Sequence, residues 1–213
     1  MIKININDFD KPKKTPINIW KEIFTKQREL IDEYKKIEDM GSLLEETYKN
    51  IDTGFGQKWI KDFAWRVTEE IAEALEAKAV FAEASLEDDK ELIQLSFSHY
   101  AEEMIDALHF LTELTIIAGY DETIFKNEVL PFITSQKEWE IVYKLGVMCN
   151  CLKNKPWKQS EMLTDRPKFK LYLQQVWLNY IAIMNYNNIF VEDIYDLYFR
   201  KHSVNKFRIR SKY

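Results

Sequence analysis

Glycine and proline are scarce in this chain, and their scarcity restricts the fold more than any other feature of the sequence. There are five of each among 213 residues. Sandwiches and barrels of many short strands need frequent glycine-rich turns, and the common phosphate-binding loops are also built on glycine. The sequence therefore argues against both kinds of fold and predicts an all-α protein.

The composition narrows the class of protein further. Hydrophobic residues make up 46% of the chain and charged residues 31%, which excludes a disordered chain. Two cysteines are too few for a disulfide scaffold or a four-cysteine zinc site. No signal peptide and no uncharged apolar stretch of 18 residues is evident, and a net charge of −5 gives no general attraction to nucleic acid. We therefore expect a cytoplasmic protein that binds neither membrane nor nucleic acid.

Apolar residues recur at helical spacing along most of the chain. The pattern predicts a helical bundle built around two long acidic helices, the second of which is apolar nearly all round and ends at Gly119, a residue suited to a helix C-terminus. The predicted helices cover residues 17–38, 43–48, 57–84, 91–118, 121–131, 138–152, 169–187 and 191–202.

The whole chain, 1–213, is expected to form one domain, with an arm at 1–16 and a basic tail at 203–213. Residues 138–202 look like a degenerate repeat of part of the segment 17–125, because Trp65 matches Trp139 at an offset of 74. At that offset the acidic residues of the first segment are replaced. Either a helical hairpin was duplicated and lost its carboxylates in the second copy, or two hairpins resemble each other by chance.

Two pairs of acidic residues carry the strongest chemical signal. Glu70 and Glu73 on one predicted helix, and Glu103 and Asp106 on the next, are each three residues apart and share a helix face. Carboxylates that face one another repel by about 1 kcal/mol in water and about 4 kcal/mol at an effective dielectric constant near 20. Oxygen ligands suit Mg²⁺ or Mn²⁺, which would relieve the repulsion and bind phosphates. The alternative is that these acids only solvate helix faces.

The end of the chain is basic and could hold those phosphates. Six positive charges and no acidic residue occur in the last fourteen positions, and arginine suits bidentate contact with phosphate oxygens. An ordinary charged and frayed terminus is the alternative. The basic residues are Arg200, Lys201, Lys206, Arg208, Arg210 and Lys212.

Two further polar residues have open interpretations. Gln27 interrupts the apolar stripe of the first predicted helix. It is either a core residue with a backbone partner or a hydrogen-bonding group that points into a pocket. His99 lies one turn before Glu103 and could contact it as an outer partner of a metal ligand.

Three motifs occur in the order typical of one family. Together they resemble the all-α nucleoside triphosphate pyrophosphatases, in the branch of the dimeric dUTPases and the phage dCTPase-dUTPases, with MazG-like enzymes as more distant relatives. The motifs are Gln-Arg-Glu-Leu at 27–30, Glu-Glu-Ile-Ala-Glu at 69–73 with Glu-Met-Ile-Asp-Ala-Leu-His-Phe at 103–110, and Lys201, Asn205 and Arg208 as Lys-x-x-x-Asn-x-x-Arg.

The resemblance implies roles for these residues. Glu70, Glu73, Glu103 and Asp106 would hold Mg²⁺, with Mn²⁺ as an alternative cofactor. Glu73, or otherwise Glu70, would act catalytically by orienting or deprotonating the attacking water. Gln27 would face the base or the sugar. Lys201, Asn205 and Arg208 would hold the phosphates, in a homodimer.

The resemblance also implies the reaction. The substrate would be a pyrimidine deoxynucleoside triphosphate, dUTP first and dCTP second, hydrolysed to the monophosphate and pyrophosphate in a bacterium or a phage-infected cell. Ile31 stands where the family usually has an amide residue, so a related hydrolase of another or a modified deoxynucleotide is an alternative. A non-catalytic helical module that binds nucleotides or nucleic acid is another.

Overall fold

The computed structural model describes residues 6–37, 49–125, 137–153, 159 and 162–211. The all-α prediction is confirmed: within these ranges the chain forms helices and no strand. None of the described helices combines the length and apolarity needed to cross a membrane. The predicted helix at 43–48, and the part of the predicted helix 121–131 beyond residue 125, lie outside the described residues. The α-helices are α1 (Ile19–Ile37), α3 (Gly54–Glu87), α4 (Lys90–Ile117), α5 (Trp139–Asn150), α6 (Arg166–Tyr186) and α7 (Val191–Ser211), with short 3₁₀ helices η1 (Ile6–Asp8) and η3 (Glu122–Phe125).

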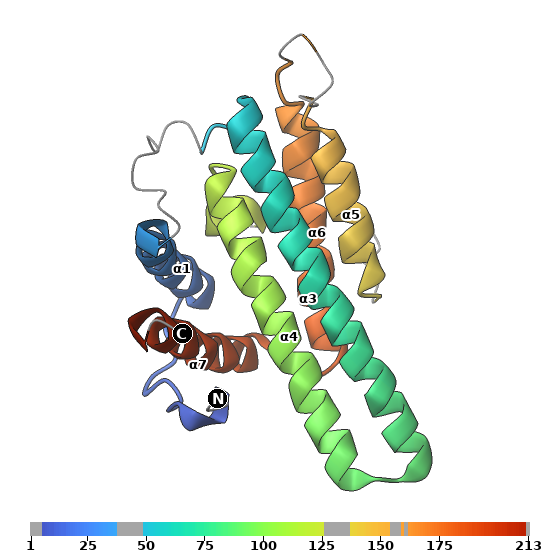
Figure 1. Ribbon diagram of the computed structural model, residues 1–213. Coiled ribbons are helices and arrows are strands. Elements are labelled where there is room, and N and C mark those ends of the chain that lie inside the picture. The colour runs from blue at the N-terminus through green and yellow to red at the C-terminus, as the bar shows by residue number, and fades with distance from the viewer. Residues whose placement is uncertain (1–5, 38–48, 126–136, 154–158, 160–161, 212–213) are drawn as a thin grey trace.

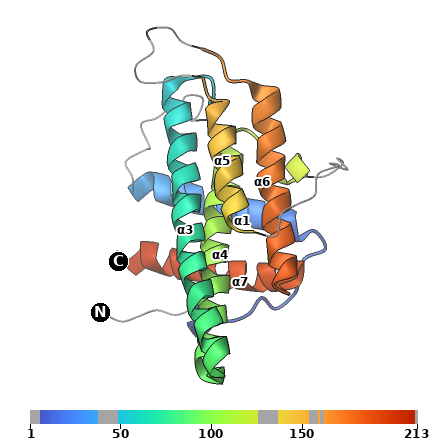
Figure 2. The same ribbon diagram turned by 90° about the vertical axis from the view of Figure 1, so that its right-hand side faces the viewer.

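The helices pack as three pairs. The long helices α3 and α4 form an antiparallel hairpin, α5 and α6 form a shorter pair beside it, and α1 packs on α7. Figures 1 and 2 show that the axes of α3, α4, α5 and α6 are roughly parallel to one another, whereas α1 and α7 lie across them on the α4 side. Helix α7 therefore meets the central hairpin at the acidic pair of α4, where Lys201 contacts Asp106, and α1 meets α4 further along, where Gln27 contacts Glu113.

Local chemistry sets the ends of the two long helices. The Thr53 side chain accepts a hydrogen bond from Gly56 N and caps α3, so this helix begins three residues before the predicted start. Asp88 ends α3 with a φ of 54°, and the Asp89 side chain caps α4. Gly119 has a φ of 84° after the end of α4, as its position in the sequence predicted.

From Tyr100 to its end α4 is buried on most of its sides, as its apolar pattern predicted, whereas most of its residues before Tyr100 are exposed or partly exposed. Two aromatic residues of α6 bond to it: Trp177 Nε1 donates to Thr115 Oγ1 over 2.9 Å, and the Tyr180 hydroxyl donates to the Met104 carbonyl over 3.0 Å. In the possible repeat, Trp177 and Tyr180 are the residues that match Glu103 and Asp106. These positions of the second hairpin fill the core. The duplication itself stays a prediction.

The last helix is longer than the sequence pattern predicted. We expected it to end near residue 202 and a tail to follow, but α7 continues to Ser211. The continuation is packed, because Val204 is buried and Phe207 meets the Phe9 ring edge-on with 6.4 Å between centroids. Lys206 Nζ lies 3.1 Å from Glu33 of α1. The basic segment is thus mostly a docked helix, and the arm at its side packs on it through Phe9.

Candidate active site

Three of the four predicted metal ligands form one cluster. Glu70 and Glu73 of α3 and Glu103 of α4 each offer a carboxylate oxygen, and these oxygens lie within 4.8 Å of one another. The i, i+3 spacing places both glutamates of α3 toward α4. Glu103 is buried, Glu70 is partly buried and Glu73 is exposed. The cluster is therefore buried on the side of Glu103 and open to solvent on the side of Glu73.

The electrostatics of the cluster show an excess of negative charge. Burial raises the pKa of Glu70 to about 8, and the charges of Asp106, Glu103 and Glu73 act in the same direction. Burial also raises the pKa of Asp106 to about 6, although the Lys201 ammonium opposes that rise. Raised pKa values mean that the charged forms of these carboxylates are poorly stabilised, and a divalent cation bound to their oxygens would stabilise them.

Asp106, the fourth predicted ligand, is paired with a lysine. Its Oδ2 lies 2.6 Å from Lys201 Nζ, which also lies 2.7 Å from Glu102 Oε1. Lys201 is only 5% exposed. The structure thus brings a residue predicted to bind phosphate onto a residue predicted to bind metal. Sequence reasoning missed Glu102, whose spacing of four residues from Asp106 on one helix face was the signal that could have found it.

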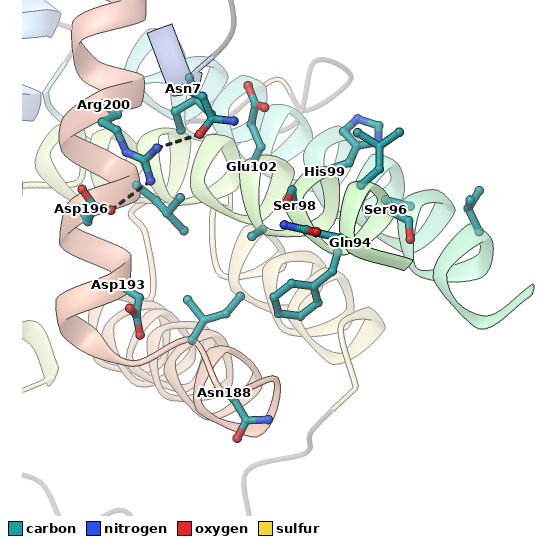
Figure 3. A pocket seen from close by; sticks show the side chains of 18 of the residues that line it. Asn7, Gln94, Ser96, Ser98, His99, Glu102, Asn188, Asp193, Asp196 and Arg200 are labelled. Carbon is teal, nitrogen blue, oxygen red and sulfur yellow. Dashed lines mark hydrogen bonds and ion pairs between the residues drawn. The ribbon is translucent and has the colours of Figure 1, made fainter. Parts of the chain in front are cut away.

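His99 contacts the cluster as one interpretation of the sequence allowed. Its Nε2 lies 2.8 Å from Glu103 Oε1. His99 and Glu102 also line a groove of about 990 Å³ between the N-terminal half of α4 and the N-terminal half of α7. Figure 3 shows both side chains on α4, with Asp196 and Arg200 opposite them on α7. The groove therefore continues directly from the acidic cluster.

Gln27 lies in a buried network of side chains. It is 1% exposed, its Nε2 donates to Glu113 Oε2 over 3.0 Å, and its Oε1 accepts from the Tyr198 hydroxyl over 2.8 Å. His109 Nδ1 lies 2.8 Å from the same oxygen, and it must be the donor because a carbonyl oxygen can only accept. Burial lowers the pKa of His109 well below its ordinary value, so the ring is neutral. Gln27 is a core glutamine with side-chain partners, and a contact with base or sugar stays a prediction.

The other two residues of the closing motif lie on α7. Asn205 and Arg208 follow Lys201 at i+4 and i+7, the spacing of one helix face. Both are partly buried. The structure therefore lines the three residues up along α7, and their contact with phosphates stays a prediction.

Together these residues can bind a cation and an anion side by side. Carboxylate oxygens of Glu70, Glu73 and Glu103 converge midway along the hairpin, and the Lys201 ammonium of α7 contacts Asp106 on the same helix as Glu103. This combination is what a metal-assisted reaction at a phosphate ester requires.

Comparison with known protein families finds a match over most of the chain. A family model described as dUTPase matches residues 19–213. No curated protein and no solved structure gives a significant match. The matched range begins at the first residue of α1 and includes every site residue named above.

Proposed function

Because the chain belongs to the dUTPase family, we propose that it hydrolyses dUTP, or as a second choice dCTP, to the monophosphate and pyrophosphate. Family membership supports a hydrolase activity of the dUTP type and the binding of a nucleotide substrate. The observation that carries the proposal is the cluster of Glu70, Glu73 and Glu103, whose oxygens lie within 4.8 Å of one another. This cluster could bind a metal ion, as hydrolysis of this kind requires.

The cofactor we propose is Mg²⁺, with Mn²⁺ as an alternative. Glu70, Glu73 and Glu103 would hold it, and Asp106 would join them once its carboxylate is free of Lys201. All four donors are oxygens, as these cations prefer, and burial together with the neighbouring acids raises the pKa of Glu70, a cost that a bound cation would relieve. When bound, the cation would supply electrostatic stabilisation to the phosphate oxygens.

The reaction itself would use the exposed end of the cluster. Glu73 is the exposed member, so we assign to it the orientation or deprotonation of the attacking water, with Glu70 as the alternative. A positioned general base contributes about 10²–10⁴-fold to a rate. The contact between His99 and Glu103 would keep the buried Glu103 carboxylate in its position beside Glu73.

The phosphates and the base would lie on either side of this centre. Lys201, Asn205 and Arg208 of α7 are assigned to the phosphate oxygens. Gln27 is assigned to the base or sugar, through the Glu113 end of its amide. The face of α4 between Asp106 and Glu113 measures about 10 Å at 1.5 Å per residue, which is the length scale of a nucleotide.

We also propose that the active unit is a homodimer. Apolar side chains stand exposed on the α3–α4 hairpin, with Leu86 at 88% and Leu95 at 65%. Exposed apolar residues grouped on one element are typical of a surface that another chain covers. Light scattering coupled to size-exclusion chromatography would test this, and a monomeric mass at micromolar concentration would contradict it.

A substrate panel tests the proposed function directly. The purified chain is incubated with each deoxynucleoside triphosphate, with Mg²⁺ and with EDTA, and the products are separated by ion exchange. We expect the monophosphate and pyrophosphate from dUTP or dCTP, only with metal. Turnover of none of the nucleotides would refute the proposal. Glu76→Gln, an exposed acid of the same helix, is the matched control for substitutions in the cluster.

A further inference from the structure

Lys201 is buried, and within the described part of the chain its ion pairs are with carboxylates of α4. Its Nζ lies 2.6 Å from Asp106 Oδ2 and 2.7 Å from Glu102 Oε1. A lysine that is 5% exposed needs such partners, because an unpaired ammonium is costly to bury. Glu102 and Asp106 are four residues apart on one face of α4, so both carboxylates can bind the same ammonium group.

The ion pair with Lys201 distinguishes Asp106 from the other predicted ligands. The oxygens of Glu70, Glu73 and Glu103 converge within 4.8 Å, but Asp106 gives one of its two oxygens to Lys201. An ammonium group and a divalent cation compete for the same carboxylate, and each repels the other through its charge. Metal binding with all four acids therefore brings the cation and the Lys201 ammonium onto one carboxylate, and the repulsion between the two cations favours release of Lys201 from Asp106.

We propose that Lys201 is a positioning residue that competes with the divalent cation for Asp106 and is released toward the substrate phosphates when the metal binds. The inference rests on the proposed function, since it concerns the same site. It assigns to Lys201 a second task in the metal-free protein, where it holds Asp106 in place. Glu102 remains as the partner that keeps the released lysine beside the site.

Metal affinity without nucleotide tests this inference. The measurement is the free Mn²⁺ signal in electron paramagnetic resonance as the ion is titrated into the protein. Lys201→Met keeps an unbranched side chain that is one atom shorter and removes its charge, and we expect its Kd for Mn²⁺ to fall at least about tenfold. Lys206→Met is the matched control, because Lys206 is also on α7 but pairs with Glu33 of α1, and its Kd should equal that of the wild type.

A double-mutant cycle separates competition for Asp106 from a general effect of charge. In an Asp106→Asn background, Lys201→Met should lower the Kd by much less than in the wild type, because the shared carboxylate is absent. An undiminished gain would overturn the inference. Lys201→Gln, which keeps donor groups but no charge, carries the same expectation if the methionine variant does not fold.

The results also distinguish this inference from the proposed function. Equal Mn²⁺ affinity of wild type and Lys201→Met, weaker binding by the variant, or binding by neither would overturn the competition. A lysine that served only the phosphates would give the first of these results, with a raised KM alone. Failure of the wild type to hydrolyse any nucleotide would overturn the proposed function, whatever the Mn²⁺ titrations show.

Discussion

Glu70→Gln should make the metal-free protein more stable and insensitive to Mg²⁺. Glu70 shares a hydrogen bond with Glu103 and lies among three other acids that raise its pKa. Glutamine has the same shape, donates the hydrogen bond that protonated Glu70 donates, and stays uncharged at pH 8, where Glu70, with a pKa of about 8, is partly ionised. The substitution therefore removes repulsion from the cluster without creating a cavity.

The size of the effect follows from the distances. Two carboxylate oxygens 4.8 Å apart repel by about 3 kcal/mol at an effective dielectric constant near 20 and by about 1 kcal/mol in water. Since Glu73 is exposed and its charge is screened, we expect a gain of about 2 kcal/mol in the free energy of unfolding. For a chain of this length that gain corresponds to about 4–8 °C in Tm.

Differential scanning calorimetry at pH 8, with EDTA and with 10 mM Mg²⁺, measures both halves of the prediction. The wild type should gain Tm with Mg²⁺, because a ligand that binds the folded state stabilises it. Glu70→Gln should begin higher and gain little. Glu76→Gln should behave as the wild type does. A variant that is less stable than the wild type in EDTA would show that the cluster is not under repulsion, and the metal-site assignment would lose its physical basis.

Three further predictions concern other parts of the site. Glu73→Gln should lower kcat at least about 100-fold with an unchanged circular dichroism spectrum, and near-normal kcat would reassign the base, with Glu70 as the next candidate. Gln27→Ala should cost about 3 kcal/mol in urea unfolding, because it strips hydrogen bonds from buried Tyr198 and His109; normal stability with an altered base preference would place Gln27 on the substrate instead. Burial lowers the pKa of His202 to about 4 from 6.5, so neutral His202 supports folding above pH 6.5 and up to about 3 kcal/mol is lost between pH 6.5 and 4. His202→Phe should flatten that part of the pH–stability curve relative to the wild type, and an unchanged slope would refute the assignment.

Much of the fold could be predicted because it is encoded by local patterns. The apolar period located all the described α-helices, and Gly119 marked the end of α4 in advance. The end of α7 could not be predicted in the same way. Its last turns are strongly basic, and they stay helical through tertiary contacts, such as the one between Phe207 and Phe9, which connect the two ends of the chain.

The candidate site divides along the same line. The acidic cluster could be predicted because its members lie on two consecutive helices at a spacing of three. The pairing of Lys201 with Asp106 joins residues 95 positions apart, and the partners of Gln27 come from α4 and α7. Spacing along one helix carries no information about such contacts. Sequence reasoning therefore found the residue types of the site but not which of them touch.

The order in which the chain is synthesised has a consequence for the metal site. All four acids lie between residues 70 and 106 on one hairpin, whereas Lys201 belongs to the last helix. A hairpin of neighbouring helices has low contact order and folds early, so it leaves the ribosome with Asp106 still unpaired. If the cluster binds Mg²⁺ as proposed, a nascent chain that meets the ion at that stage would fill the cluster before Lys201 has been synthesised. The lysine would then dock onto an occupied site, and this route to the metal-bound protein would avoid the exchange that a finished, metal-free molecule must make.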